Sequence, residues 1–272
     1  MEHITFCKSI GLPSAALDVI RCVSVDEAEF FTLKNLFFQD ISAFQRQVMA
    51  HRNWKQRFLF LYTRLASEAF EEYQKRSIPE DVFWDTFSDF KLWYENCLRD
   101  FDEPGLAEYD WLWRHIRLLL FRLGRLQFMP LALPDPLRLE KRRLPAGAVV
   151  LDTHIPQGEP LDIDKVYGSF RRALSFFHGV YPVFSCHSWL LYPALKEILP
   201  VSSRILQFQQ LFQIVHTDEA DRQAEERIFG KISDDPRLYS ESTALQRTAK
   251  RHLLEGKRLG SARGVFWFHA ED

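Results

Sequence analysis

Apolar side chains in the first half of the chain recur every three or four residues, which is the spacing of one helical face. One such stripe consists of Trp54, Phe58, Leu61, Leu65 and Ala69, and a second consists of Phe83, Phe87, Phe90 and Tyr94. Asp26 is placed to cap an earlier helix. After a break at Asp102-Glu103-Pro104-Gly105, a third helix is predicted from about 106 to 123, ended by Gly124. The first half is therefore predicted to be helical, with most of its aromatic side chains in the core.

The second half changes from helical spacing to short apolar runs rich in β-branched residues, which indicate strands. Strands are predicted at 126–129, 148–155, 182–189, 205–215 and 264–268. Helices are predicted at 162–178, 193–199, 219–229 and 243–255. This order predicts an α/β layout with at least one strand–helix–strand crossover. We expect two domains, a helical one over 1–122 and a second over 123–272.

Charge divides the chain in a similar place. Residues 1–110 hold 12 Lys and Arg against 19 Asp and Glu, whereas residues 111–272 hold 23 against 18. A phosphate-bearing ligand is therefore expected on the second half, although ordinary drift in composition gives the same pattern. A basic cluster of Arg138, Lys141, Arg142 and Arg143 indicates a solvated hairpin or loop. The overall formal charge of −2 excludes a strong field that draws the chain to nucleic acid or an anionic membrane.

Several other classes lack their sequence signals. The four cysteines lie far apart and form no CxxC pair, which argues against a zinc ribbon or a disulfide framework. No signal peptide is expected at the N-terminus, and no apolar run approaches the ~18 residues of a membrane span. Walker, GxGxxG, HExxH and GxSxG motifs are absent, and no histidine spacing predicts a metal site. We therefore expect a cytoplasmic protein without a nucleic-acid or membrane partner.

One candidate site is the string Phe184-Ser185-Cys186-His187-Ser188-Trp189, at the end of a predicted strand. Strand ends in α/β folds are where sites are built. Neighbouring residues of a strand point to opposite faces, so Cys186 could pair only with another base, such as His154. The alternatives are a buried, apolar Cys186 and a hydrogen-bonded structural His187.

A second candidate is the stretch 151–162, in which a strand leads through a loop containing glycine into a helix. Backbone N–H groups at the start of a helix can bind phosphate, and Gln157 and Gly158 are placed to contribute. Glu159 and Asp162 oppose such a site, because carboxylates favour the same end of the helix. An ordinary capped turn is the alternative interpretation.

Five strings together resemble the bacterial acyltransferase-domain proteins. They are Leu123-Gly124-Arg125-Leu126-Gln127-Phe128, His154-Ile155-Pro156, Cys186-His187-Ser188-Trp189-Leu190-Leu191, Ile205–Phe212 and Leu245-Gln246-Arg247. The resemblance covers nearly the whole chain and is densest from Leu123 to Phe212. It implies an N-terminal helical N-acyltransferase domain followed by a GNAT-like mixed sheet flanked by helices, an α/β (α+β) fold.

The resemblance also implies a cosubstrate and site residues. Acetyl-CoA or another acyl-CoA would bind at Ile155, Gln157, Gly158 and Ser188. His154 or His187 would remove the proton from the acceptor amine, Cys186 would lie beside the thioester, and Tyr192 is a possible acid to the leaving thiolate. A backbone N–H near Cys186 would stabilise the oxyanion. The family's usual loop, Gln/Arg-x-x-Gly-x-Gly/Ala, is altered here, because Pro160 lacks an N–H and the second small residue is missing.

Three functions follow from these patterns. The first is an acyl-CoA-dependent N-acyltransferase acting on an unknown small-molecule or peptide amine. The second is a non-catalytic, GNAT-derived module that binds a ligand or a protein, which the altered loop favours. The third is acyl transfer or hydrolysis through the thiol of Cys186.

Overall fold

A computed structural model describes residues 1–139 and 142–268, so Lys141 of the predicted basic cluster lies outside the described residues. The chain forms two compact units, Met1–Leu123 and Gly124–Asp272.

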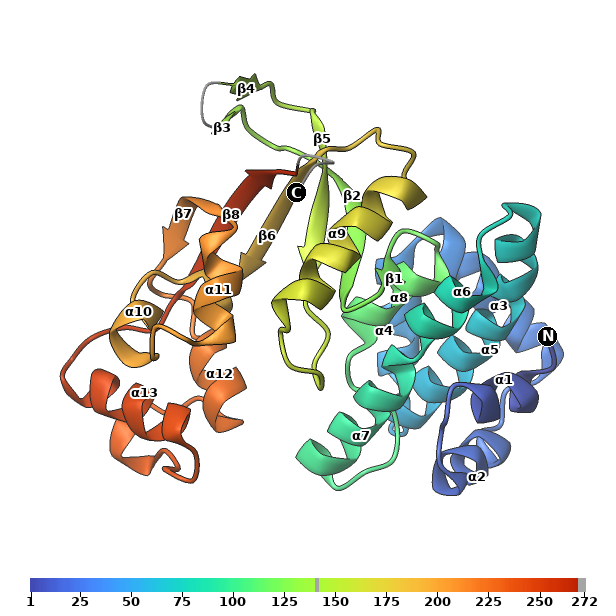
Figure 1. The fold of residues 1–272 in the computed structure, drawn as a ribbon. Coiled ribbons are helices and arrows are strands. Elements are labelled where there is room, and N and C mark those ends of the chain that lie inside the picture. The colour runs from blue at the N-terminus through green and yellow to red at the C-terminus, as the bar shows by residue number, and fades with distance from the viewer. Residues whose placement is uncertain (140–141, 269–272) are drawn as a thin grey trace. The chain divides into compact units, whose positions relative to one another are not determined.

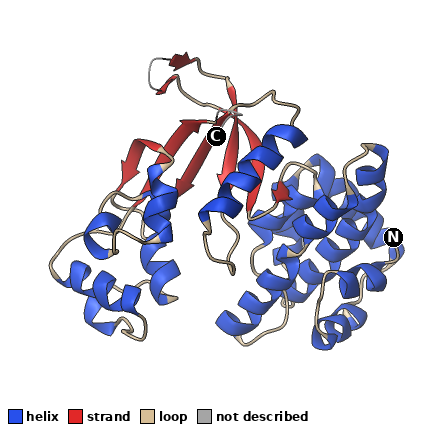
Figure 2. Cartoon of the chain, viewed as in Figure 1, coloured by secondary structure: helices blue, strands red, loops and turns tan. Residues whose placement is uncertain are grey.

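The first unit is built from helices packed around one long central helix (Figures 1 and 2). The elements are α1(His3–Ser9), α2(Ser14–Cys22), α3(Glu27–Gln39), α4(Ile41–Met49), α5(Trp54–Lys75), α6(Glu80–Phe87), α7(Asp89–Phe101), α8(Tyr109–Ile116) and β1(Phe121–Leu123). Helix α5 contacts α1, α2, α4, α6 and α8. Its predicted stripe is confirmed, because Phe58, Leu61, Leu65 and Ala69 are all buried. Aromatic rings form the core here, as Phe44, Phe58 and Tyr62 show by their mutual contacts.

Two helix predictions in this unit need correction. The stripe from Phe83 to Tyr94 is buried, but it spans two helices, α6 and α7, which meet at Ser88. The helix predicted to reach residue 123 ends at Ile116, and residues 121–123 form β1. Leu118 takes a left-handed backbone with φ 55°, and the N–H of Leu119 donates to the carbonyl of Arg114. This is a Schellman-type helix end, which normally uses glycine and so gave no signal in the sequence.

The second unit contains a mixed sheet in which neighbouring strands follow the order β2(Leu126–Ala132), β5(Val149–His154), β6(Val183–Ser188), β8(Ser261–Trp267) and β7(Gln213–Asp218). Strands β5 and β6 are parallel, and the other adjacent pairs are antiparallel. Helix α9(Ile163–Phe176) connects β5 to β6, which confirms the predicted crossover. Strands β3(Leu137–Leu139) and β4(Arg142–Leu144) form a separate two-stranded ribbon, as the hairpin interpretation of the basic cluster predicted.

Helix α9 packs on one face of this sheet through the fully buried ring of Phe170 (Figure 1). Its ring centroid lies 5.7 Å from that of Phe128 on β2, 4.7 Å from Phe184 on β6 and 4.8 Å from Phe266 on β8. Rings from three strands therefore meet one helix. The opposite face of the sheet is covered at one end by the ribbon, whose Leu137, Leu139 and Leu144 pack with apolar residues of the strands, among them Val150, Val183 and Val265.

The remaining helices pack around a second apolar cluster. They are η1(Trp189–Leu191), α10(Leu195–Ile198), α11(Arg204–Gln210), α12(Gln223–Phe229), η2(Pro236–Leu238) and α13(Ala244–Leu254). The cluster includes Leu195, Leu206, Ile228, Ala249 and Leu253. Within the described residues, no helix is both long and apolar enough to cross a membrane.

The strand predicted over 205–215 is wrong for most of its length. Residues 204–210 form α11, which Ser203 caps by accepting from the N–H of Ile205, and β7 begins at Gln213. The buried side chains include Leu206, Phe208, Gln209 and Phe212. Spacings of three and four within this set also fit a helical face, so the alternation was ambiguous in a short apolar run.

Candidate active site

Strands β5 and β6 separate within their length. Their parallel pairing covers Leu151 with Phe184 and Asp152 with Ser185. Beyond these positions β5 continues to His154 and β6 to Ser188, and Figure 1 shows the two arrows diverging. On β6, alternate backbone N–H groups point toward β5 rather than β8. Past Ser185 such groups are available to a ligand that lies between the strands.

The two predicted histidines lie on the face of the sheet opposite α9. Phe184 contacts Phe170 of α9, so the alternation of side chains places Cys186 on that face and Ser185 and His187 on the other. A hydrogen bond between Ser185 and Asp152 places Asp152, and with it His154, on the same side as His187. The structure therefore brings both imidazoles to one face, at the ends of the separating strands.

Asp152 connects the two strands where their pairing ends. The Ser185 hydroxyl donates to Oδ1 of Asp152 over 2.6 Å, and Nε2 of His154 lies 3.2 Å from Oδ2. Burial opposes ionisation of this carboxyl, but the contacts with His154 and Ser185 and the charge of Arg263 outweigh it and hold the pKa of Asp152 below its usual value. A carboxylate is thus retained inside the sheet next to an imidazole.

The two histidines have different surroundings. The side chain of His154 is 24% exposed, and its register partner on β2 is the buried Gln127. His187 is exposed, lies opposite Arg263 in the β6–β8 register, and its Nε2 is 3.0 Å from Oγ of Ser261. His154 is thus next to a carboxylate, whereas His187 is next to a cation and a hydroxyl.

The structure argues against a nucleophilic role for Cys186. Its side chain is 1% exposed, and burial, with the nearby Asp152 charge, raises the pKa of the thiol well above its usual value. It also points to the face opposite His154, so the thiol–histidine pair that the sequence left open is not formed. The described cysteines are all free thiols.

The end of β6 is fixed by contacts of its own. Ser188 accepts a hydrogen bond from the N–H of Leu190 and so caps η1. The N–H of Trp189 donates to Oε1 of Gln223, the first residue of α12, over 3.1 Å. Tyr192 follows η1 and is 7% exposed. Burial and the charges of Glu219 and Glu197 raise the pKa of Tyr192, which keeps its phenol protonated.

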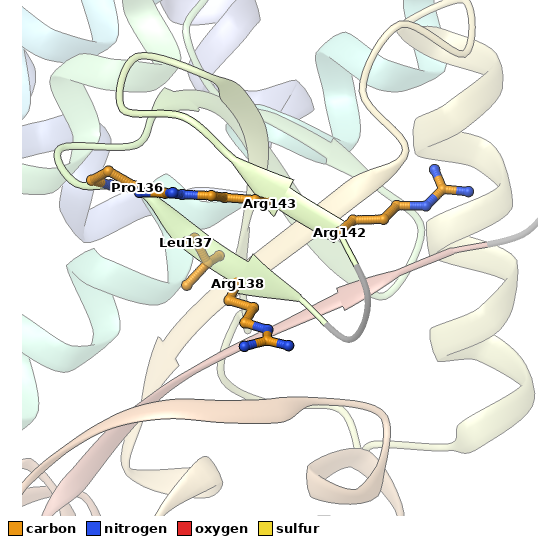
Figure 3. A pocket seen from close by; sticks show the side chains of 5 residues that line it. All are labelled: Pro136, Leu137, Arg138, Arg142 and Arg143. Atoms are coloured by element: carbon orange, nitrogen blue, oxygen red, sulfur yellow. The ribbon is translucent and has the colours of Figure 1, made fainter.

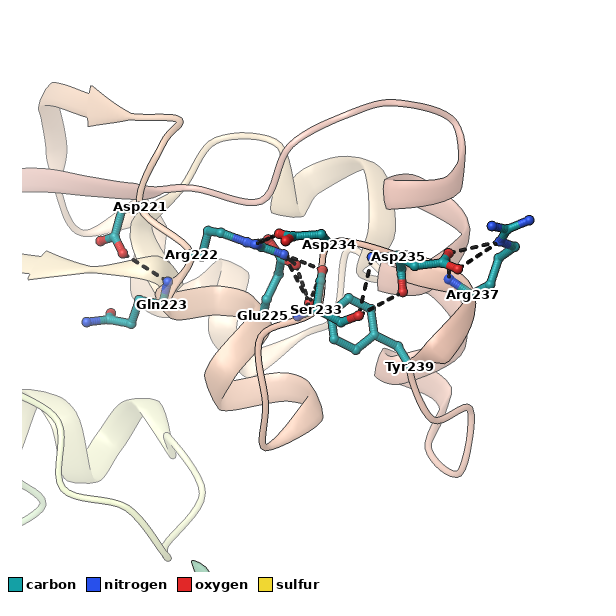
Figure 4. Close-up of polar contacts among 9 residues, drawn as sticks. All are labelled: Asp221, Arg222, Gln223, Glu225, Ser233, Asp234, Asp235, Arg237 and Tyr239. Atoms are coloured by element: carbon teal, nitrogen blue, oxygen red, sulfur yellow. Dashed lines mark hydrogen bonds and ion pairs between the residues drawn. The ribbon is translucent and has the colours of Figure 1, made fainter. Parts of the chain in front are cut away.

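A polar network holds the start of α12 (Figure 4). Arg222 binds Glu225 through two nitrogens, at 2.8 and 2.7 Å, and Asp234 through a third at 2.8 Å. The Tyr239 hydroxyl donates to Glu225 and accepts from the N–H of Ser233. Because Glu225 is buried, these partners are what make its charge tolerable. The network fixes the segment that contains Gln223, and through it the end of β6.

The predicted phosphate loop between β5 and α9 is exposed at Gln157, Gly158 and Glu159. Gly158 has φ 109°, a backbone that only glycine adopts without strain, and a Cβ there would meet open space. Asp162 caps α9 by accepting from the N–H groups of Asp164 and Lys165. The carboxylate therefore occupies part of the helix start, as the sequence indicated.

Arg125 holds the backbone of this loop by hydrogen bonds and was not among the predicted site residues. Arg125 is only 5% exposed, and its guanidinium donates hydrogen bonds to the backbone carbonyls of Glu159 and Pro160. Its own N–H donates to Oγ of Ser169 on α9, and Gly124 is required beside it because a Cβ would lie 2.9 Å from the same oxygen. Since N–H and C=O point in opposite directions across a trans peptide, the N–H of Leu161 points away from Arg125.

A hollow of about 540 Å³ lies beside the ribbon and is lined by Pro136, Leu137, Arg138, Arg142 and Arg143 (Figure 3). None of these is a predicted site residue. The guanidinium of Arg142 lies over the ring of Trp267 at 4.0 Å. Within residues 1–139 and 142–268, no group of three or more His, Cys, Asp or Glu side chains is arranged to hold a metal ion.

Comparison with known proteins assigns the family. Residues 1–118 match the family described as the N-acyltransferase N-terminal domain, and residues 120–266 match the GNAT-like C-terminal domain. A search of curated proteins finds no match.

Solved structures show the same fold. An acyltransferase in complex with decanoyl-CoA and teicoplanin has a TM-score of 0.79 and 21% sequence identity, over 98% of this chain and 88% of that one. An acyltransferase mutant in complex with octanoyl-CoA has a TM-score of 0.78 and 20% identity, over 97% and 87% of the two chains. The chain therefore belongs to the family of proteins that join an N-acyltransferase N-terminal domain to a GNAT-like C-terminal domain.

Proposed function

We propose that this protein transfers an acyl group from acyl-CoA to the amine of a small-molecule or peptide acceptor. The observation that carries the proposal is the separation of β5 from β6 after the paired residues Asp152 and Ser185. His154 and His187 lie on one face of the sheet, next to the gap between the two strands. Structures of similar fold support the choice of donor. One is an acyltransferase in complex with decanoyl-CoA, and another is an acyltransferase in complex with CoA and 10C-teicoplanin.

In the proposed reaction, the acceptor nitrogen attacks the thioester carbonyl directly. The amine proton passes to His154 or His187, or to a water that either holds, and such positioned proton transfer contributes roughly 10²–10⁴-fold. Backbone N–H groups of β6 that face the gap stabilise the oxyanion. When the tetrahedral intermediate collapses, the C–S bond breaks and the thiolate takes a proton, for which the protonated phenol of Tyr192 is the candidate donor.

The pantetheine would lie between β5 and β6, beside Ile155 and Ser188, and the pyrophosphate would lie at Gln157 and Gly158. Arg125 adds a positive charge beneath that loop and fixes its carbonyls away from the ligand. Pro160 supplies no N–H, so the cradle has one donor fewer than the usual loop.

Calorimetric titration of the purified protein with CoA, acetyl-CoA and decanoyl-CoA tests the donor. Saturable one-to-one binding is expected, followed by release of free CoA when an amine acceptor is added. His187→Ala and His154→Gln should each lower turnover with little change in melting temperature, whereas His51→Gln, at an exposed position of the first unit, serves as the matched control.

The second candidate function is a non-catalytic binding module, favoured by the proline in the loop. A folded protein that binds none of the three ligands up to millimolar concentration would exclude acyl transfer from CoA and favour that function.

A further inference from the structure

We propose that Arg263 is a specificity-determining residue of the site, and that it binds a carboxylate of the amine acceptor. Arg263 is the register partner of His187, on the side of β6 that lies away from the gap between β5 and β6. The inference rests on the proposed function for the identity of the ligand as an acceptor, but carboxylate binding can be tested without any acyl donor.

The register of the sheet places Arg263 between two imidazoles. It is the partner of His187 on β6 and of His216 on β7, and β8 lies between these two strands (Figure 1). Phe266 contacts Phe170 of α9, so the alternation of side chains along β8 directs Arg263 to the opposite face. The guanidinium therefore belongs to the face of the sheet that carries the candidate site.

Arg263 is a partly buried cation, and its guanidinium forms no hydrogen bond or ion pair with residues 1–139 or 142–268. Two other partly buried cations of this unit have carboxylate partners. Arg222 binds Glu225 at 2.7 Å, and its charge is balanced there. Lys250 binds Glu241 at 2.8 Å. Arg263 thus keeps the N–H donors of its planar fork available to a ligand.

The carboxylate of the site does not neutralise Arg263. Asp152 on β5 accepts from the Ser185 hydroxyl over 2.6 Å and forms no ion pair with Arg263. The two charges act on each other only at longer range, where Arg263 helps to lower the pKa of Asp152. On either side along the row, Arg263 has His187 and His216, which bring no negative charge. The local charge therefore favours an incoming anion.

A carboxylate is the anion that matches this position. A guanidinium binds a carboxylate through two parallel hydrogen bonds, which fixes the orientation of the ligand as well as its place. A phosphoryl group carries up to about two negative charges, more than one guanidinium balances on a face that already holds Asp152. A carboxylate carries one charge, which Arg263 alone can balance.

The position of Arg263 also limits the length of the acceptor. Neighbouring strands lie about 4.8 Å apart, so a carboxylate held over β8 is about 5–10 Å from an amine at the gap beyond β6. Each residue of an extended chain spans at most about 3.3–3.6 Å. The acceptor class that fits is a molecule the length of two or three peptide residues, with a free amine at one end and a carboxylate at the other.

The direct test is an NMR titration of the protein without any acyl donor. The probes are N-acetyltriglycine, which carries a carboxylate, and N-acetyltriglycinamide, which has the same length without the charge. Saturable shifts of the backbone amides of His187, Arg263 and His216 are expected with the acid only. Arg263→Gln should weaken binding of the acid at least about fivefold, and Arg263→Lys should be intermediate because lysine lacks the planar fork. Arg251→Gln, which removes an exposed arginine of α13, is the matched control.

Three results of the titration would overturn the proposal. They are equal binding of the acid and the amide, binding of the acid to Arg263→Gln as tight as to the wild type, and the absence of any saturable shift with the acid.

A kinetic test uses triglycine and triglycinamide as acceptors and follows the release of free CoA. The wild-type protein is expected to prefer triglycine at least about tenfold in kcat/KM, mainly through KM, and Arg263→Gln should lose this preference while Arg251→Gln keeps it. A folded Arg263→Gln protein that keeps the preference would overturn the proposal. An Arg263-dependent preference for succinyl-CoA over acetyl-CoA would place the carboxylate on the donor and overturn the assignment to the acceptor. If the wild-type protein binds no CoA, the acyltransferase function fails, while the titration still decides whether Arg263 binds a carboxylate.

Discussion

Arg125 offers a sharp test of how the loop after β5 is held. The Arg125→Met variant keeps much of the apolar stem and removes the guanidinium. Two hydrogen bonds from a charged donor are lost, one of them 3.1 Å long from Nε to the carbonyl of Pro160. Such bonds contribute roughly 1.5–3 kcal/mol each when their partners are left buried. Glu159 and Pro160 are exposed, so water can replace the donor, and we expect a total loss near 2 kcal/mol in the free energy of unfolding.

The effect on CoA binding follows from backbone order. In the wild-type protein Arg125 fixes the backbone of Glu159 and Pro160 before any ligand binds. Ordering a residue costs about 1–2 kcal/mol, and in the variant part of this cost is transferred to binding. The backbone of Pro160 is already restricted by its ring. For the two residues together, we therefore expect a loss of about 2 kcal/mol in the free energy of CoA binding, which corresponds to a Kd for CoA about thirtyfold higher.

Calorimetric titration with CoA, together with urea unfolding, measures both quantities on each variant. Arg125→Lys should be intermediate, because lysine keeps the charge and loses the planar pair of donors. Arg76→Met removes an exposed arginine that pairs with Glu72 and should change neither quantity by more than about 0.5 kcal/mol. If Arg125→Met is less stable but binds CoA as the wild type does, Arg125 supports only the fold and the loop argument is refuted.

Three further outcomes are expected. Gly158→Asp should weaken CoA binding in calorimetry by charge repulsion, and Gly158→Asn, which shares the backbone strain at φ 109° but adds no charge, should weaken it less; equal losses would point to backbone strain alone. Phe170→Ala should lower the free energy of unfolding in urea by about 3–5 kcal/mol, because the ring is fully buried among rings from three strands, and a loss below about 1 kcal/mol would contradict that packing. The folded-state pKa of Asp152 is lowered, so its contribution to stability is present above the unfolded value of 3.8 and is lost as the pH falls through the folded value. The difference in unfolding free energy between wild type and Asp152→Asn should therefore shrink between pH 7 and pH 3, and a constant difference would exclude this linkage.

Much of the fold could be predicted because the patterns were long or strongly bounded. The stripe on α5 extends over four turns, and the crossover from β5 through α9 to β6 is bounded by prolines and a capping aspartate. The failures are local. Leu118 takes a left-handed backbone, which a leucine in the sequence does not predict. The short run beginning at Ile205 fits both a strand and a helix.

The candidate site was less predictable, because its contacts join strands that lie far apart in sequence. His154 and His187 were identified as candidates, but their surroundings depend on register partners in β2, β6 and β8. Asp152 did leave one signal, since a carboxylate within an apolar strand requires a partner. Arg125 left none, because an arginine after a glycine is typical of an exposed turn, and its burial follows only from the approach of α9 and the loop.

The arrangement of one sheet face bears on the choice between an enzyme and a binding module. The ribbon leucines cover Val150, Val183 and Val265 at one end of this face. The next residues on the same face are polar, Asp152 and His154 on β5 and Ser185 and His187 on β6. A fold selected for stability alone would continue the apolar surface at Asp152 and Ser185, because replacing a largely buried charged group by a well-packed apolar one is often neutral or stabilising. A binding module needs a shaped surface, but it does not need a carboxylate and two imidazoles beside the gap between two strands. Polar residues at positions where packing favours apolar ones are typical of a functional site, and this observation favours the proposed acyl transfer over a binding module.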